Sequence, residues 1–279
     1  MIYSPKTKDE LIELIKIKDN NTYFIAGGTD IIIKIKNKKL TDYNIIDLTK
    51  MSEFAKIEEN DSTVSIGSIV TMTELTESEL IKKYFHSVYQ AAYHLGSEQI
   101  RNLATVGGNL ANASQSADVL LALYSLNAKI KILNSLGEEK IIPIEELILG
   151  REKTSLADDE VIESIILEKK DNQITGFCKI GSRKAVTISK ISCAVNLIVK
   201  DSEISNPTVY LGAVGVVPTR AKLIEEYLSS VLTSEIDLKK LQELASEEVD
   251  LAIPTRESRH YKRVAIKGLM DDLLQDLKL

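Results

Sequence analysis

The spacing of apolar residues near the start of the chain predicts a small unit of mixed helix and strand. Residues 7–18 carry apolar side chains at helical spacing behind Ser4-Pro5, a typical helix start. Short apolar runs at 23–26 and 44–48 predict two strands, while residues 31–35 fit either a strand or a short helix. We therefore expect the first unit to end near residue 53.

The pattern then changes to hairpins and helices up to residue 169. Hairpins are expected from 54–57 with 63–67 and from 128–133 with 140–142, a further strand over 161–167, and helices over 84–95 and 117–126. Thr73 is expected to cap a helix that begins at Glu74. The polar stretch 169–172 is the best candidate for a domain boundary.

Strands followed by helices fill the rest of the chain. The strands are expected around 176–180, 193–199 and 208–213, and the helices over 220–231, over 238–251 and from 258 onward. This order predicts an α+β domain. We therefore expect residues 1–169 to form one domain, with subdomains of about 1–53 and 54–169, and residues 170–279 to form a second.

Composition places the chain among ordinary globular proteins. It has 279 residues, of which 44% are hydrophobic and 27% charged, and a formal net charge of −6. This charge argues against a general affinity for nucleic acid. No stretch approaches the roughly 18 apolar residues of a membrane span, and the amino terminus lacks the apolar run of a signal peptide. We expect a cytoplasmic protein.

Cysteine and histidine usage argues against a metal site. The only cysteines, Cys178 and Cys193, lie in apolar, strand-like segments, which favours buried free thiols over a disulfide. Two cysteines do not complete a four-cysteine iron–sulfur site. His86, His94 and His260 lack the spacing of metal ligands, and we interpret His94 as a helix-face residue rather than a base.

Two glycine pairs are the strongest chemical signal. The first segment is Phe24-Ile25-Ala26-Gly27-Gly28-Thr29-Asp30, and the second is Thr105-Val106-Gly107-Gly108-Asn109, with Ser114 and Asp118 beyond it. Glycine pairs allow positive φ and close approach of a ligand, and consecutive N–H groups form a nest for an anion. Neither segment has the spacing of a nicotinamide dinucleotide fingerprint or a phosphate loop. We therefore predict that both turns converge on one pyrophosphate, which suggests a dinucleotide.

The second glycine segment with its flanks, residues 95–114, resembles the FAD-binding medium subunit of the molybdenum hydroxylases. That family includes bacterial xanthine dehydrogenases, carbon monoxide dehydrogenase and nicotinate dehydrogenase. The resemblance extends over nearly the whole chain, through 26–30, 179–183, 211–214 and 261–263. It implies an α+β protein with a two-subdomain FAD-binding fold and a small α+β C-terminal domain. Gln115 departs from the family, which often has proline there, so we expect a looser turn before Asp118.

The resemblance also implies which residues bind the cofactor. They are Phe24, Ile25, Ala26, Gly27, Gly28, Thr29, Asp30, Ile31, Leu95, Thr105, Val106, Gly107, Gly108, Asn109, Ser114, Asp118, Ile162 and Lys179. Asp118 corresponds to a carboxylate on the polar chain of the cofactor, and Ile162 and Lys179 correspond to positions beside the flavin ring. Each of these three also fits a purely structural role: Asp118 as a carboxylate in the first turn of a helix, Ile162 as a core residue, and Lys179 as a solvated strand residue.

The resemblance finally implies a function within a hetero-oligomer. FAD would be bound non-covalently here, since no histidine or cysteine adjoins either glycine pair, while partner subunits would hold a molybdenum cofactor and two-iron clusters. Electrons would pass through FAD to an external acceptor, often NAD⁺. Two alternatives remain. A free-standing flavin oxidase or reductase would need a base near the flavin, and we find none. A non-catalytic assembly protein without FAD is disfavoured by the intact glycine pairs.

Overall fold

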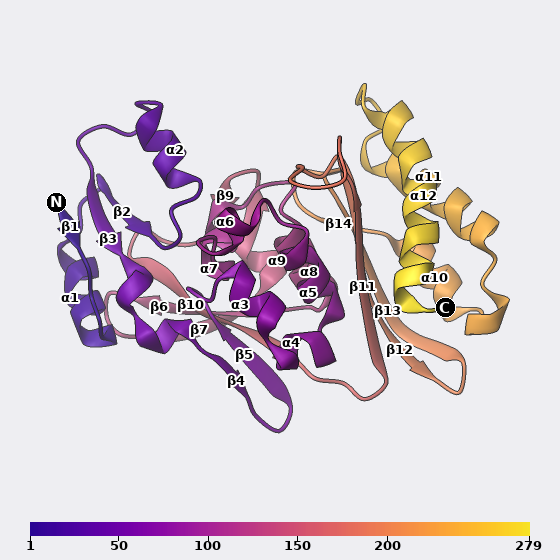
Figure 1. The fold of residues 1–279 in the computed structure, drawn as a ribbon, viewed down its shortest axis with the longest axis horizontal. Helices are drawn as coiled ribbons and strands as arrows, with labels where there is room; N and C mark the ends of the chain where they lie inside the picture. The colour runs from indigo at the N-terminus through magenta and orange to yellow at the C-terminus, as the bar shows by residue number, and fades with distance from the viewer.

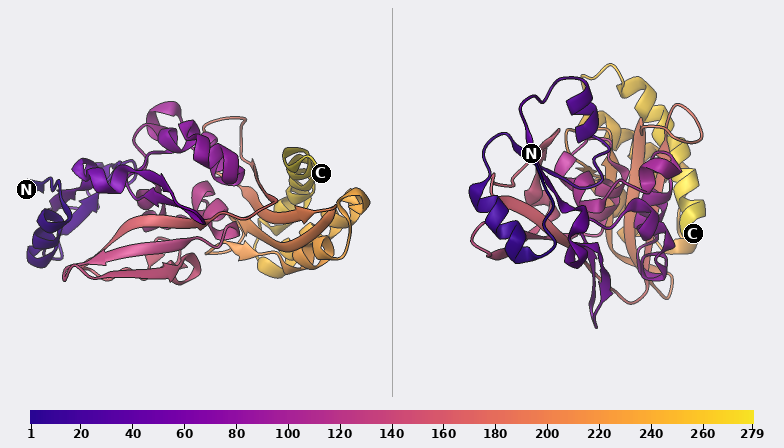
Figure 2. Two further views of the ribbon diagram at one scale, coloured as in Figure 1. Left: turned by 90° about the horizontal axis from the view of Figure 1, so that it is seen from below. Right: turned by 60° about the vertical axis from the view of Figure 1, so that its left-hand side comes forward.

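A computed structural model describes residues 1–279 and arranges them as three sheets in succession, from the amino-terminal unit to the carboxyl-terminal helices (Figure 1). In a view from below, the amino-terminal unit lies at one end, a five-stranded sheet in the middle, and the last sheet with its helices at the other end (Figure 2). A separate two-stranded ribbon is formed by β8 (Ile148–Gly150) and β9 (Lys153–Thr154). None of the helices combines the length and the apolar composition that crossing a membrane requires.

The first unit is a small parallel sheet with two helices. Its strands, in the order β1-β3-β2, are β1 (Ile2–Tyr3), β3 (Asn44–Asp47) and β2 (Thr22–Ile25). Helix α1 (Lys8–Ile17) begins where the Thr7 side chain accepts a hydrogen bond from the Glu10 N–H, and it buries Leu11 and Ile15. Residues 31–35, which the sequence left open, belong to helix α2 (Ile31–Lys36), none of whose residues is buried.

The middle unit is an antiparallel sheet covered by short helices. Its strands, in the order β4-β5-β10-β6-β7, are β4 (Ile57–Glu59), β5 (Thr63–Gly67), β10 (Glu160–Glu168), β6 (Lys129–Asn134) and β7 (Glu139–Pro143). Its helices are α3 (Met72–Glu77), α4 (Glu79–Tyr84), α5 (His86–Tyr93), α6 (Glu98–Arg101), α7 (Val106–Asn112), α8 (Asp118–Ser125) and α9 (Ile144–Leu147). Their apolar faces share one large core with the sheet, and this core fixes α7 and α8 in place.

Two local predictions in this unit are wrong. The cap of α3 is Thr71 rather than Thr73: Thr71 accepts from the Glu74 N–H, and the Glu74 carboxylate accepts from the Thr71 N–H. This capping box satisfies two groups at once, so the helix starts at Met72, two residues earlier than expected. Phe54, expected in a hairpin strand, lies in a 3₁₀ turn instead, because its fully buried ring belongs to the core of the first unit.

The last unit is a four-stranded antiparallel sheet with three helices. Its strands, in the order β11-β12-β13-β14, are β11 (Gln173–Ile180), β12 (Ile191–Lys200), β13 (Glu203–Gly212) and β14 (Thr219–Arg220). Helices α10 (Lys222–Ser229), α11 (Leu238–Ala252) and α12 (Arg259–Leu277) cover one face. The other face adds Phe177, Ala194 and Tyr210 to the core of the middle unit. The sheet therefore joins the two units by burying both of its faces.

Candidate cofactor-binding site

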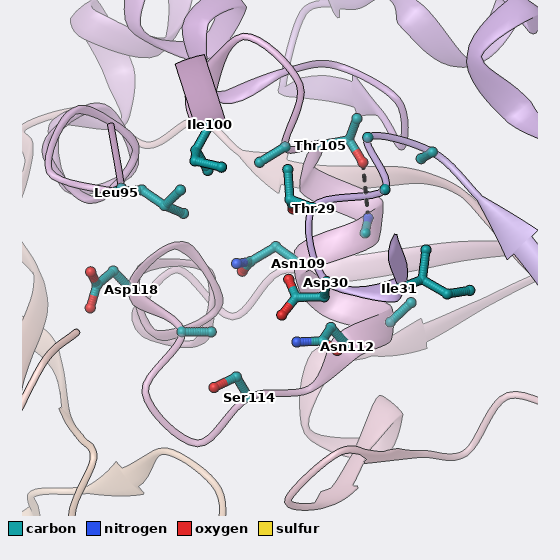
Figure 3. Close-up of a pocket in the computed structure, with 18 of the residues that line it drawn as sticks. Thr29, Asp30, Ile31, Leu95, Ile100, Thr105, Asn109, Asn112, Ser114 and Asp118 are labelled. Atoms are coloured by element: carbon teal, nitrogen blue, oxygen red, sulfur yellow. Dashed lines mark hydrogen bonds between the residues drawn. The ribbon is translucent and has the colours of Figure 1, made fainter. Parts of the chain in front are cut away.

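A cavity of about 650 Å³ lies between the first unit, the helices of the middle unit and the end of β11. Thr29 and Asp30 lie on one side, Leu95 and Asp118 on the other, and Asn109 between them (Figure 3). Most of the predicted cofactor residues line it: Phe24, Ile25, Ala26, Gly27, Gly28, Thr29, Asp30, Ile31, Leu95, Thr105, Gly108, Asn109, Ser114, Asp118 and Lys179. Residues 80 or more positions apart in the sequence therefore converge on one cavity.

The first glycine loop joins β2 to α2 and presents bare backbone to the cavity. Gly28 has φ of +71°, which glycine adopts without strain. Gly27 is required by close packing instead, since a Cβ at this position would lie 1.8 Å from the carbonyl oxygen of Leu103. The N–H groups of residues 27–30 donate to no group in the chain. Consecutive free N–H groups of this kind bind anions.

The second glycine pair differs from the prediction of a positive-φ nest. Gly107 and Gly108 lie in the first turn of α7, and neither has positive φ. Both N–H groups already donate hydrogen bonds within the chain. The Gly107 N–H donates to the carbonyl oxygen of Ser68 at 2.7 Å, and the Gly108 N–H donates to the Thr105 hydroxyl oxygen at 3.1 Å. A Cβ at Gly107 would lie 2.6 Å from the Ser68 Cβ. Gly107 is therefore required for packing and does not line the cavity.

Asp118 and Lys179 form a buried ion pair across the two larger units. The Lys179 Nζ lies 2.6 Å from Oδ2 of Asp118 and also donates to the carbonyl oxygens of His94 and Thr187. The Ser189 hydroxyl donates to Oδ1 of Asp118 at 2.5 Å. The two charged side chains are only 7% and 9% exposed. Burial raises the pKa of Asp118, and the Lys179 ammonium opposes part of that rise.

This arrangement changes the interpretation of both residues. Lys179 is not a solvated strand residue, because its ammonium is enclosed by three oxygen acceptors. Both carboxylate oxygens of Asp118 are already hydrogen-bonded within the chain. The pair therefore fixes the wall of the cavity at the junction of the two units.

Ile162 and Val106 lie away from the cavity. Ile162 is 3% exposed, pairs with Ile132 across the sheet and belongs to the middle core. The resemblance implies a place beside the flavin ring, whereas β10 is the central strand of its sheet and gives Ile162 the core position that the sequence analysis also allowed. Val106 is fully buried in the same core.

Other apolar residues line the end of the cavity near Leu95. These are Ile100, Val186 and Ile188, which the sequence analysis missed. Ile188 is 77% exposed although it lines the cavity. The available signal was the pair of apolar residues in an otherwise polar segment between two strands. Asn112 and Ser116, further lining residues, follow the second glycine pair so closely that they could have been included.

The cavity fits a ligand with an anionic centre and an apolar end. Its volume lies within the roughly 300–1,000 Å³ of small-molecule sites. The free N–H groups of residues 27–30 suit a pyrophosphate, and Thr105, Asn109 and Ser114 add neutral polar groups along the wall. Leu95, Ile100 and Ile188 supply the apolar end. FAD has this combination of groups, so the residues present fit it.

Two family models match the chain in succession. Residues 1–168 match the FAD-binding domain in molybdopterin dehydrogenase, and residues 177–277 match the carbon monoxide dehydrogenase flavoprotein C-terminal domain. Known structures show the same fold: carbon monoxide dehydrogenase from Hydrogenophaga pseudoflava aligns with a TM-score of 0.87 at 22% identity, covering 99% of this chain and 96% of that one. The enzyme from Oligotropha carboxidovorans aligns with a TM-score of 0.88 at 20% identity, with the same coverage.

Curated relatives extend over most of the chain. The nicotinate dehydrogenase FAD-subunit of Eubacterium barkeri is 30% identical over 282 residues, covering 99% of this chain and 95% of the relative. The xanthine dehydrogenase FAD-binding subunit of Escherichia coli O157:H7 is 26% identical over 255 residues, covering 90% and 87%. The chain therefore belongs to the family of FAD-binding medium subunits of molybdopterin dehydrogenases, and it is an oxidoreductase flavoprotein subunit.

Proposed function

We propose that the described cavity holds FAD non-covalently and that this subunit carries electrons from iron–sulfur clusters of one partner to an external acceptor such as NAD⁺. A second partner subunit would hold the molybdenum cofactor. FAD, when bound, supplies the electron exchange, and the chain supplies binding, orientation and electrostatics. We further propose that residues 1–169 form the cofactor domain and residues 170–279 the second domain, supported by the end of β10 at Glu168 and the start of β11 at Gln173.

The observation that carries the proposal is the row of free N–H groups at residues 27–30 on the cavity wall. These groups would hold the pyrophosphate, while Asn109 and Ser114 would bind polar groups of the cofactor. Leu95 and Ile188 would cover the flavin ring. Asp118 would act mainly through the wall it fixes, because both of its oxygens already have partners.

A binding experiment tests the site. The purified chain, loaded with FAD, should show a flavin absorbance spectrum, and acid precipitation should release all of the colour into the supernatant. In ¹⁵N-resolved spectra, the amide signals of residues 27–30 should shift as FAD is added. FAD binding without a shift at these amides would place the pyrophosphate elsewhere, and failure to bind FAD would refute the proposal.

An electron-transfer experiment tests the role in a complex. Purines, aldehydes, nicotinate and carbon monoxide should not bleach the flavin of the isolated chain under anaerobic conditions. The chain has no cluster of side chains that could hold a metal, and the Asp118–Lys179 pair on the cavity wall is already hydrogen-bonded within the chain. In the assembled complex, its substrate should bleach the flavin, and NAD⁺ should restore the colour. Rapid bleaching of the isolated chain by such a substrate would favour a free-standing flavin oxidase.

A further inference from the structure

A second cavity, of about 580 Å³, follows the free edge of β11. Residues 177–184 form its floor. Gln90 of α5 and His94 just after this helix line one side, and Asp272 and Asp276 of α12 line the other. Figure 1 shows α5 and α12 on opposite sides of β11. We call this cavity the edge groove. It is separate from the cofactor cavity and adjoins it at Lys179 and Thr187, which line both.

The backbone of β11 presents unpaired groups to the edge groove. Val199 of β12 donates to the carbonyl oxygen of Asn172, and Lys190, just before β12, donates to that of Ile180. The backbone N–H and C=O groups of even-numbered residues of β11 therefore point toward β12, and those of odd-numbered residues point outward. The Phe177 N–H accordingly points outward and donates to Asp276 at 3.4 Å. The carbonyl of Phe177 and both backbone groups of Lys179 face the groove without a strand partner.

One end of the edge groove is closed and the other is open. The His86 Nε2 lies 3.2 Å from Oδ1 of Asp276, and this contact joins α5 to α12 across the groove next to Phe177. Closure of this kind protects a strand edge from pairing with other chains. At the open end the Arg183 guanidinium is held by the carbonyl oxygen of Val186. Phe177 itself is buried, and the residues from Cys178 to Gly181 are partly exposed.

Charges of opposite sign flank the accessible part. Lys184 stands at the open end and forms no ion pair, and Asp272 on the α12 side forms none either. A strand added here would meet a cation at one end and a carboxylate along one side. Added strands gain affinity from backbone hydrogen bonds and specificity from their side chains, so this charge pattern selects the segment that fits.

We propose that the edge groove receives a short extended peptide segment of a partner subunit, which pairs with β11 as an additional strand. The segment would place a carboxylate near Lys184 and a cationic side chain near Asp272. The His86–Asp276 contact limits the pairing to a few residues around Lys179. The backbone of Lys179 would bind the segment while its ammonium holds Asp118 on the cofactor side. The inference rests on the proposed assembly with partner subunits.

Hydrogen exchange of the full complex tests the groove. Amides of residues 177–184 should exchange more slowly in the assembled FAD-containing complex than in the isolated FAD-loaded chain. Unchanged exchange in a complex that assembles and transfers electrons would overturn the inference and leave the proposed function intact. Failure of the chain to assemble with any partner would overturn both. Protection that grows with the concentration of the isolated chain would assign the groove to a second copy and overturn the inference.

Charge-reversal variants supply matched controls. Asp272→Lys and Lys184→Glu should each lower the affinity of assembly about threefold or more at low salt. Each variant replaces an attractive charge pair between the groove and the added segment with a repulsive one. Two variants serve as controls: Asp271→Lys, at the neighbouring position on α12, and Lys170→Glu, at another exposed lysine. Neither position lines the edge groove, so both variants should assemble as the natural chain does. Equal effects of Asp272→Lys and Asp271→Lys would overturn the inference.

Discussion

The two glycines of α7 should respond very differently to the same small substitution. An alanine Cβ at Gly107 would lie 2.6 Å from the Cβ and 2.7 Å from the carbonyl oxygen of Ser68. At Gly108 the nearest atom is the Thr105 hydroxyl oxygen at 2.9 Å, which belongs to a side chain, and the rest of the space opens into the cavity. Gly268 on α12 has no atom within 4 Å of the added Cβ and serves as the control.

The expected magnitudes follow from these neighbours. Overpacking typically costs about 1–3 kcal/mol, and the Ser68 backbone that meets the Gly107 substitution moves little, so about 3 kcal/mol is expected there. Alanine regains up to about 1 kcal/mol as a better helix former than glycine. The net loss for Gly107→Ala is therefore about 2 kcal/mol, or roughly 4–8 °C in Tm. Gly108→Ala and Gly268→Ala should keep or slightly raise the Tm.

Thermal unfolding of the FAD-free chain and titration with FAD together check this prediction. Gly108→Ala should weaken FAD binding with a normal Tm, Gly268→Ala should change neither quantity, and Gly107→Ala should lower the Tm. Loss of stability in Gly108→Ala equal to that in Gly107→Ala would refute the reasoning. An unchanged Tm in Gly107→Ala would show that the Ser68 contact relaxes without cost.

Three further predictions concern charged and thiol groups. Asp118→Asn leaves the Lys179 ammonium buried without its counter-charge and should cost about 3–5 kcal/mol in urea unfolding; a loss below about 1 kcal/mol would contradict it. Hydrogen bonds from Lys131 and Lys8 lower the pKa of Glu139 from its ordinary value of 4.5 to about 2. Its stabilising contribution is therefore complete above about pH 4.5 and lost as the pH falls toward 2, so Glu139→Gln should flatten the stability profile in that window. Burial raises the pKa of Cys178 to about 12 and that of Cys193 further, so neither thiol should react with a thiol reagent at pH 8 until the chain unfolds.

The periodicity of the sequence predicted the helices and strands better than it predicted which strands pair with one another in a sheet. The run at 161–167 was expected to be a strand and lies within β10. Its pairing with β5 on one side and β6 on the other was not predicted, because β5 lies about a hundred residues away and strand pairing at that distance leaves no local pattern. The cap at Thr71 was missed because Thr71 and Thr73 are equally good capping residues until the helix start is known.

The site was predicted from residue types, and the structure changed several of their roles. Gly107 and Gly108 were expected to expose N–H groups, but whether an N–H group is free depends on a distant acceptor such as Ser68. Likewise, Lys179 and Asp118 are 61 positions apart, and only the packing of the last sheet on α8 brings them together. Exposed Ile188 gave no periodic signal, because it belongs to no helix or strand.

The poorly buried helix α2 is expected to control how fast the protein is degraded. This helix buries none of its isoleucines, and its one ion pair joins Lys34 to Glu152 at 3.5 Å. A segment with so little burial opens at low free energy and exposes its backbone to proteases. A ligand held by the adjoining residues 27–30 would favour the closed form by mass action. Proteases would then degrade subunits without the cofactor faster than subunits that hold it. As a result, most of the subunits that remain for assembly would carry the cofactor.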